Sequence, residues 1–230
     1  DGGGIYVVDV SWQFGFSLIN CTLNNNSANT SGGGIYILEG YLTLTDCSFI
    51  NNTATNGGGG LYGMGEFDDC EFSDNSTSNG DGGGIFLSNH SSLTNCTLVS
   101  NNAAQMGGGI FSDDKDSTLI NCTFQMNSSQ LGGGFGVFGQ YSETDFVGCS
   151  FNGNIAESGG GIYTSDVNLT LTDTILCENI PQNIDGDYSN GGGNCVAVSC
   201  DDFDDDGWPD DCSPYEGTIP VPQDYPTIQS

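Results

Sequence analysis

An acidic run near the C-terminal end of the chain has the clearest capacity for binding chemistry. Seven aspartates lie between residues 201 and 211, and three of them occupy alternate positions before Gly207, which permits a sharp turn. Carboxylate and carbonyl oxygens in a flexible loop suit Ca²⁺ better than Mg²⁺, which demands near-octahedral geometry. The sequence predicts a calcium loop at 201–213, with ligands from Asp202, Asp204, Asp206, the carbonyl of Trp208, Asp210 and Asp211.

The order of these ligands is that of an EF-hand-type loop, except that position twelve is Ser213 instead of a bidentate Glu. The run more closely resembles the thrombospondin type 3 pattern DxDxDGxxD, which often ends in Cys, as this run does at Cys212. The resemblance implies a calcium-stabilised segment in which Asp211 replaces the missing ligand. The alternative is a solvated acidic linker that holds no ion.

Four cysteines that lie outside the repeated positions also occur at this end: Cys177, Cys195, Cys200 and Cys212. We expect two disulfides that close the end of the fold, and we favour Cys177–Cys195 and Cys200–Cys212, although sequence does not fix connectivity. Ten cysteines without a Cys-x2-Cys pair fit an oxidising compartment better than a zinc site.

The elements that must position these residues are near-identical repeats of about 25 residues. After an opening glycine triplet, each repeat contains the pattern Cys-x-[Leu/Phe]-x-x-Asn. The seventh copy has Thr174 in the cysteine position. Cys and the Leu or Phe are two residues apart, so they share one face of a strand while their polar neighbours face out. Three glycines and an apolar residue open the repeats at Gly2, Gly32, Gly58, Gly82, Gly107, Gly132 and Gly159.

Short alternating strands and glycine turns at this period predict an all-β fold, a right-handed parallel β-helix of about seven coils with three short strands each. Apolar side chains should fill the bore, the space that the coils enclose, and asparagine amides should hydrogen-bond along the stack. The cysteines should be buried thiols, with disulfides between neighbouring coils as the alternative. The stacked columns are Cys21, Cys47, Cys70, Cys96, Cys122 and Cys149, the apolar residues from Leu23 to Leu176, and the asparagines from Asn26 to Asn179.

The paired motifs GGG[IL] and [FL]xxN resemble the repeats of polymorphic outer-membrane-protein-type and related secreted bacterial right-handed β-helix proteins. The resemblance covers residues 1–180, and the departures from it are a third glycine and the cysteine before [FL]xxN. It implies a protein that is secreted or exposed on the cell surface, in a family of adhesins and of proteins without an assigned role.

The chain divides into four expected parts: a β-helix at 1–180, a closing segment at 181–200, the calcium loop at 201–213, and a linker and strand at 214–230. The last part contains VPQDYPTIQ, which resembles the opening of a bacterial β-helix domain. It either begins the next unit of a tandem array or adds a strand to the next molecule; the alternative is a cleavage boundary. The start DGGGIY likewise suggests a processed form or a fragment. The expected assembly residues are Val221, Tyr225, Thr227 and Ile228.

The charge balance of the chain is extreme, with 30 acidic residues against one basic residue, Lys115, and a formal net charge of −29. The phosphates of nucleic acids and anionic membranes would meet almost no basic side chains, so we expect neither partner. No apolar run approaches the ~20 residues of a membrane span, so we also expect no membrane insertion. These features favour a secreted, extracellular protein.

Residues with the potential for catalysis are few. Polysaccharide lyases of this fold use Arg or Lys against acidic sugars, whereas this chain has only Lys115, beside Asp113, Asp114 and Asp116. A glycoside hydrolase needs two carboxylates across a cleft, and the only histidine, His90, lies in a polar loop without an evident partner. We therefore expect no enzymatic activity.

The interpretation that fits best is a non-enzymatic extracellular structural protein, a subunit of a surface fibre or adhesive stalk that assembles head-to-tail with copies of itself. The alternative is a carbohydrate-binding or polysaccharide-degrading β-helix, with an extracellular glycan as its partner. A column of outward aromatic residues could stack against sugars, although such columns more often cover a sheet face. These residues are Tyr6, Tyr36, Tyr62, Phe86, Phe111 and Tyr163.

Overall fold

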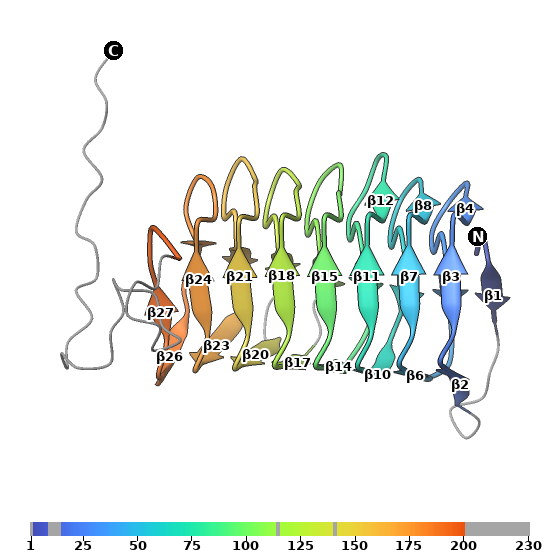
Figure 1. Cartoon of the computed structure of the whole chain (residues 1–230), viewed down its shortest axis with the longest axis horizontal. Helices are drawn as coiled ribbons and strands as arrows, with labels where there is room; N and C mark the ends of the chain where they lie inside the picture. The colour runs from blue at the N-terminus through green and yellow to red at the C-terminus, as the bar shows by residue number, and fades with distance from the viewer. Residues whose placement is uncertain (1, 9–14, 114–115, 140–141, 201–230) are drawn as a thin grey trace, which may run out of the picture.

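The computed structural model describes residues 2–8, 15–113, 116–139 and 142–200. In these ranges the strands stack into a parallel β-solenoid of about seven coils, followed by a shorter, irregular coil at 181–200. Figure 1 shows the coils side by side along one axis, from β1 at one end to β27 at the other. The predicted parallel β-helix is confirmed.

Each coil contributes one strand to each of three sheets, and every neighbouring pair is parallel. Like residues therefore lie on like, as Ile5 beside Ile35 and Leu23 beside Phe49. Sheet A consists of β1 (Ile5–Val7), β5 (Ile35–Ile37), β9 (Leu61–Gly63), β13 (Ile85–Leu87), β16 (Ile110–Asp113), β19 (Phe135–Phe138), β22 (Ile162–Ser165) and β25 (Ile184–Asp185). Sheet B consists of β2 (Phe16–Ile19), β6 (Leu42–Thr45), β10 (Gly65–Asp68), β14 (Ser91–Thr94), β17 (Ser117–Ile120), β20 (Glu143–Val147), β23 (Asn168–Thr172) and β26 (Ser189–Gly192). Sheet C consists of β3 (Thr22–Asn24), β7 (Ser48–Ile50), β11 (Glu71–Ser73), β15 (Thr97–Val99), β18 (Thr123–Gln125), β21 (Ser150–Asn152), β24 (Ile175–Cys177) and β27 (Cys195–Val196).

A small fourth sheet, sheet D, follows sheet C in the first three coils, and the chain then returns to sheet A through the glycine triplet. Gly32 has φ of +67°, and a Cβ on Gly33 would lie 2.2 Å from the carbonyl oxygen of Gly59 in the next coil. The triplet is therefore needed both for backbone conformation and for the close approach of successive coils. Sheet D consists of β4 (Ser27–Ala28), β8 (Thr53–Ala54) and β12 (Ser76–Thr77).

Apolar side chains fill the bore, as predicted. The rings of Phe49 and Phe72 stack with centroids 4.6 Å apart, and those of Phe124 and Phe151 are 4.3 Å apart. All four side chains are fully buried. Since burying one such side chain contributes about 1.5–3 kcal/mol, the repeated column is a main source of the stability of the fold.

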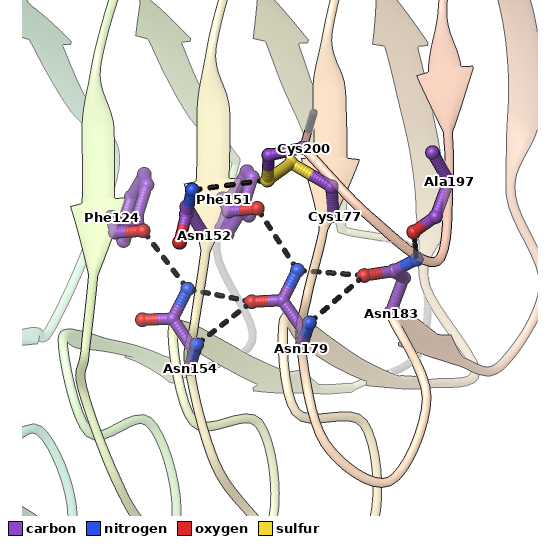
Figure 2. The surroundings of a disulfide bond; sticks show 9 residues. All are labelled: Phe124, Phe151, Asn152, Asn154, Cys177, Asn179, Asn183, Ala197 and Cys200. Carbon is purple, nitrogen blue, oxygen red and sulfur yellow. Dashed lines mark hydrogen bonds between the residues drawn. A yellow bond between two sulfur atoms is a disulfide. The ribbon is translucent and has the colours of Figure 1, made fainter. Parts of the chain in front are cut away.

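The asparagine ladder is the column of Asn side chains at the inner corner that follows sheet C. In each step one Oδ1 accepts two bonds from the preceding Asn: the N–H and Nδ2 of Asn75, for example, both lie 3.0 Å from Oδ1 of Asn101. Each Nδ2 also donates to a strand carbonyl, as Asn101 does to Phe72 at 2.8 Å. The expected bonding is confirmed. The structure adds a rung at Asn183, beyond the repeat, which bonds to Ala197 (Figure 2).

The cysteine ladder is the column Cys21, Cys47, Cys70, Cys96, Cys122 and Cys149 at the inner corner between sheets B and C. All six thiols are free, and all except the partly exposed Cys21 are buried. Each of the buried thiols donates weakly to the carbonyl two residues before it, such as Cys96 to Thr94 at 3.4 Å. The expectation of buried thiols is confirmed, and the ladder contains no disulfide between coils.

The closing segment brings a correction to the cysteine pairing. A disulfide joins Cys177 to Cys200, with Cα atoms 5.4 Å apart, so the predicted Cys177–Cys195 and Cys200–Cys212 pairings are both wrong. The register of β24 with β27 places Cys195 opposite Ile175, two residues from Cys177, while the chain after β27 brings Cys200 back to Cys177 (Figure 2). Cys195 is also disulfide-bonded.

Candidate functional site

The outer face of sheet A carries the most ordered surface feature of the described residues. The rings of Tyr6, Tyr36, Tyr62 and Phe86 stack in sequence, with centroids 5.4, 4.9 and 4.5 Å apart. The in-register pairing of β1, β5, β9 and β13 aligns them, since each ring occupies the middle position of its strand. We call these four residues the aromatic stripe.

The stripe ends where the predicted aromatic column departs from the structure. Phe111 was expected to face outward, but it is only 2% exposed, because it packs between the tilted rings of Phe86 and Phe138. In the next coil Gly136 occupies the column, and a Cβ there would meet the side chain of Met106 at 2.4 Å. The outward position of Tyr163 is therefore separated from the stripe by two coils, one with the buried Phe111 and one with Gly136 in the column.

The stripe is polar only at its phenol groups. Burial raises the pKa of Tyr36, and the neighbouring Tyr6 raises it further. Burial also raises the pKa of Tyr62, followed by the effects of Tyr36 and Asp113. The hydroxyl groups of Tyr36 and Tyr62 therefore stay protonated well above neutral pH and can donate hydrogen bonds. Both ring faces of Tyr36 and Tyr62, however, are covered by neighbouring rings, so these two residues offer a ligand only ring edges and hydroxyl groups.

The single histidine lies at the corner between sheets A and B, where the structure corrects a second expectation. His90 Nδ1 is 3.4 Å from a carboxylate oxygen of Asp116, which belongs to the next coil, so His90 does have a partner. The second oxygen of Asp116 accepts the backbone N–H of Glu143 at 2.8 Å. Both side chains are exposed, and exposed contacts of this kind contribute little to stability.

A shallow hollow of about 510 Å³ lies between the ends of β22 and β23 and the last coil. Two carboxylates, Asp166 and Asp187, are among the residues that line it. The hydroxyl of Thr164, which is also part of the lining, is buried without a hydrogen-bond partner in the described residues. The hollow is only partly enclosed and has a mostly polar lining, which is unlike the enclosed, mostly apolar sites that hold small ligands.

Several predicted site residues lie outside the described residues. They include the calcium ligands Asp202, Asp204, Asp206, Trp208, Asp210 and Asp211, the cysteine Cys212, and the assembly residues Val221, Tyr225, Thr227 and Ile228. The acidic cluster is also divided, because Asp113 and Asp116 are described whereas Asp114 and Lys115 are not. Among the residues that are described, no three His, Cys, Asp or Glu side chains converge to hold a metal ion.

Sequence reasoning missed one property of the cysteine ladder, namely its hydrogen bonds. The backbone N–H of Cys122 donates to Sγ of Cys149 at 3.4 Å, and the N–H of Cys149 donates to Oγ1 of Thr174 at 3.3 Å. Thr174 in turn donates its N–H to Asn194 at 2.9 Å. The sequence did contain a signal for these hydrogen bonds, because Thr174, whose side chain has a hydroxyl group, replaces cysteine in the seventh copy.

Comparison with known proteins agrees with this geometry. The family model for a right handed β-helix region matches residues 3–176, which is more than half of the chain. The chain belongs to the right-handed β-helix family. No curated protein and no solved structure matches it. For this β-helix protein, no helix in the described ranges is long and apolar enough to cross a membrane.

Proposed function

We propose that this β-helix protein is a non-enzymatic extracellular structural protein, a subunit of a surface fibre or adhesive stalk that assembles head-to-tail. The observation that carries the proposal is the edge formed by β1, β2 and β3. Within the described residues, each of these strands is paired on one side only. The bore residues Ile5, Val7, Phe16, Leu18 and Cys21 are partly exposed at this end. Unpaired edges of this kind favour strand addition.

The charge of the chain favours contact through the ends over contact through the sides. Because each chain has a formal net charge of −29, two rods that approach side by side repel one another along their length. The ends offer what the sides lack, since three strand edges can each form backbone hydrogen bonds to another coil. A contact between two different ends does not close on itself and so generates a filament.

The acidic run directly follows the last coil in the sequence, so a calcium loop there would add a cation to the C-terminal segment that the proposal uses for assembly. The donor set of carboxylates and a carbonyl suits Ca²⁺. Binding would neutralise part of a concentrated negative charge at the end that must meet another acidic molecule. We therefore expect assembly to require Ca²⁺ and to be lost in EDTA.

The proposal is tested by electron microscopy and sedimentation of the full chain in Ca²⁺, compared with a variant that lacks residues 217–230. The full chain should form filaments one rod wide, and the deletion should leave monomers with unchanged circular dichroism. Asp204→Asn with Asp206→Asn should behave as the full chain does in EDTA. Filaments that persist in the deletion variant would show that the C-terminal segment is not the assembly element.

The alternative function, carbohydrate binding, would use the aromatic stripe. Sugars stack on exposed ring faces, but here the faces of Tyr36 and Tyr62 are stacked on their neighbours. The geometry therefore favours packing over sugar stacking, and we place this function second. Affinity electrophoresis on neutral polysaccharides tests it: a shift that disappears in Tyr36→Ala with Tyr62→Ala would establish the stripe as a glycan site.

A further inference from the structure

The cysteine ladder is a set of metal-ligating side chains that the proposed function does not use. It places one free thiol in each of six successive coils, at equivalent positions on the inner side of one corner. We propose that neighbouring thiols of the ladder form two-coordinate sites for soft monovalent cations such as Cu(I) or Ag(I). Each ion is held in a line between two thiolates of adjacent coils.

The spacing of the coils fits this geometry. Equivalent atoms of neighbouring parallel strands repeat about every 4.8 Å. A metal–thiolate bond is about 2.3 Å long, so two such bonds in a line span about 4.6 Å. A disulfide instead requires Cβ atoms about 3.5–4.5 Å apart and sulfur atoms about 2.05 Å apart. An in-register stack is thus too wide for a relaxed disulfide but well matched to a bridging ion.

The thiol protons can leave without loss of an essential hydrogen bond. Cys47, Cys70, Cys96, Cys122 and Cys149 each donate to the carbonyl two residues before them. Each of these five carbonyls also accepts a backbone N–H from the preceding coil, as Ile120 does from Asn95 at 2.9 Å. Loss of the proton therefore leaves no carbonyl at this corner unpaired, which avoids the main cost of removing a buried donor.

Backbone donors are directed at the sulfur atoms. The N–H of Cys122 donates to Sγ of Cys149 at 3.4 Å, and such bonds become stronger when the acceptor is a thiolate. Burial raises the pKa of the Cys47 thiol, while the backbone N–H of Cys21 opposes this rise. The Cys47 thiol is thus protonated when empty, and the bound cation offsets one of the two negative charges that a pair of thiolates carries.

The chemistry balances without an oxidant or a reductant. Two thiols and one M⁺ give one RS–M–SR⁻ unit and release two protons to solvent. Soft thiolate ligands select soft ions such as Cu(I). The ladder offers ligands in a row, so a third thiolate is not within reach of an ion between two rungs. Zinc, which takes four ligands in a tetrahedron, is therefore disfavoured.

The outer side of the same corner attracts cations. Asp46 and Asp69 immediately precede Cys47 and Cys70, so carboxylates lie on the solvent side of a corner that has thiols on its inner side. Cys21 is only partly buried, in contrast to the other five rungs. Loading should accordingly begin between Cys21 and Cys47, and it should protect Cys21 from alkylation by iodoacetamide.

Two double variants with the same number of thiols test the proposal. Cys70→Thr with Cys96→Thr leaves two adjacent pairs, whereas Cys47→Thr with Cys122→Thr leaves only one, between Cys70 and Cys96. Thr174 already occupies this column, so threonine is compatible with the fold. Both chains are titrated with silver nitrate in chloride-free buffer without oxygen, and bound ions are counted by native mass spectrometry.

The expected counts are three ions for the natural chain, one for each pair of six thiols, then two and one for the variants. The melting temperature should rise with each bound ion. Equal counts in the two double variants would overturn the proposal, because binding would then follow thiol number and not adjacency. Isolation of the native chain with its ladder already oxidised, two mass units lighter for each pair, would also overturn it.

Discussion

The asparagine ladder and the cysteine ladder lie at neighbouring corners of the same coils, and they bond the backbone with different strength. At the asparagine corner each side chain accepts two bonds and donates two, at 2.7–3.0 Å for most rungs. At the cysteine corner each sulfur makes long contacts of 3.2–3.6 Å to carbonyls that already have a donor. The amide column is therefore required by hydrogen bonding, and the thiol column mainly by volume.

This difference indicates which repeated residue can be substituted without loss of the fold. An amide carries both a donor and an acceptor, so no other side chain of its size continues the asparagine ladder. Sulfur is a weak donor and a weak acceptor, and Thr174 and Asn194 continue the cysteine column with the same direction of bonding. Because the thiols at this corner form only weak hydrogen bonds, they remain available to bind a ligand.

The largest effect should come from removal of one amide rung. Asn101→Ala leaves the N–H and the Nδ2 of Asn75 without their acceptor, and it removes one donor from the carbonyl of Phe72. Because a buried unpaired group costs about 1–3 kcal/mol, we expect a loss of about 3–5 kcal/mol in the free energy of unfolding. Urea unfolding followed by circular dichroism measures it.

The neighbouring Asn102 gives the matched control for this experiment. Its side chain is exposed, and its Nδ2 donates only to the hydroxyl of Ser128 at 2.6 Å. Asn102→Ala should change stability by no more than about 0.5 kcal/mol, as is usual for surface substitutions. Equal losses for the two variants would contradict the distinction between a bonded inner column and its solvated neighbours.

The second largest effect concerns sulfur that is not in the ladder. Cys177→Ser opens the disulfide to Cys200, which closes a loop of 23 residues in sequence separation. Loop-closure entropy for this length predicts a loss of about 3 kcal/mol. Limited proteolysis should then cut first within 181–200. The test extends the comparison of the two ladders, since loss of a cysteine that closes a loop should lower the free energy of unfolding more than loss of a cysteine that only fills space at a corner.

The repeat explains what the sequence could predict and what it could not. The columns of Cys, Phe or Leu, and Asn follow from one period, so their stacking could be derived from spacing alone. The Cys177–Cys200 pairing depends on how residues 181–200 fold back, and they have no repeat. Asn183 joins the ladder from four residues after Asn179 for the same reason. The His90–Asp116 pair joins loops of two coils that have no common motif.

Burial of Phe111 was missed for a different reason. Its neighbours along the stack are the tilted rings of Phe86 and Phe138, and the latter comes from the end of β19, outside the aromatic column. A column read from the sequence takes each coil as identical, whereas Gly136 removes one ring and Met106 occupies the space. The calcium loop at 201–213 lies outside the described residues and remains a prediction.

A smaller effect should follow exchange of one ladder thiol. Cys96→Ala leaves a cavity at the corner and should cost about 1–2 kcal/mol, whereas Cys96→Thr should cost less than about 1 kcal/mol. Threonine retains a donor and an acceptor, and Thr174 shows how its hydroxyl bonds to the carbonyl of Thr172 at 2.9 Å. Chemical unfolding of the two variants side by side measures the difference. A threonine variant less stable than the alanine variant would contradict the expectation that threonine can replace cysteine at this corner.

The smallest effect is a dependence of stability on alkaline pH. Burial raises the pKa of the Cys47 thiol above its ordinary value of about 9. The folded state then holds its proton more tightly than the unfolded state does, so this contribution is complete below pH 9 and is lost as pH rises through the folded pKa. Buried tyrosines with raised pKa values, such as Tyr62, add a loss of the same sign. Thermal melts of the natural chain and of Cys47→Thr from pH 8 to 11 isolate the thiol, because the tyrosine contribution is common to both. The variant should lose less stability than the natural chain above pH 9, and parallel curves would mean that the rung does not titrate in this range.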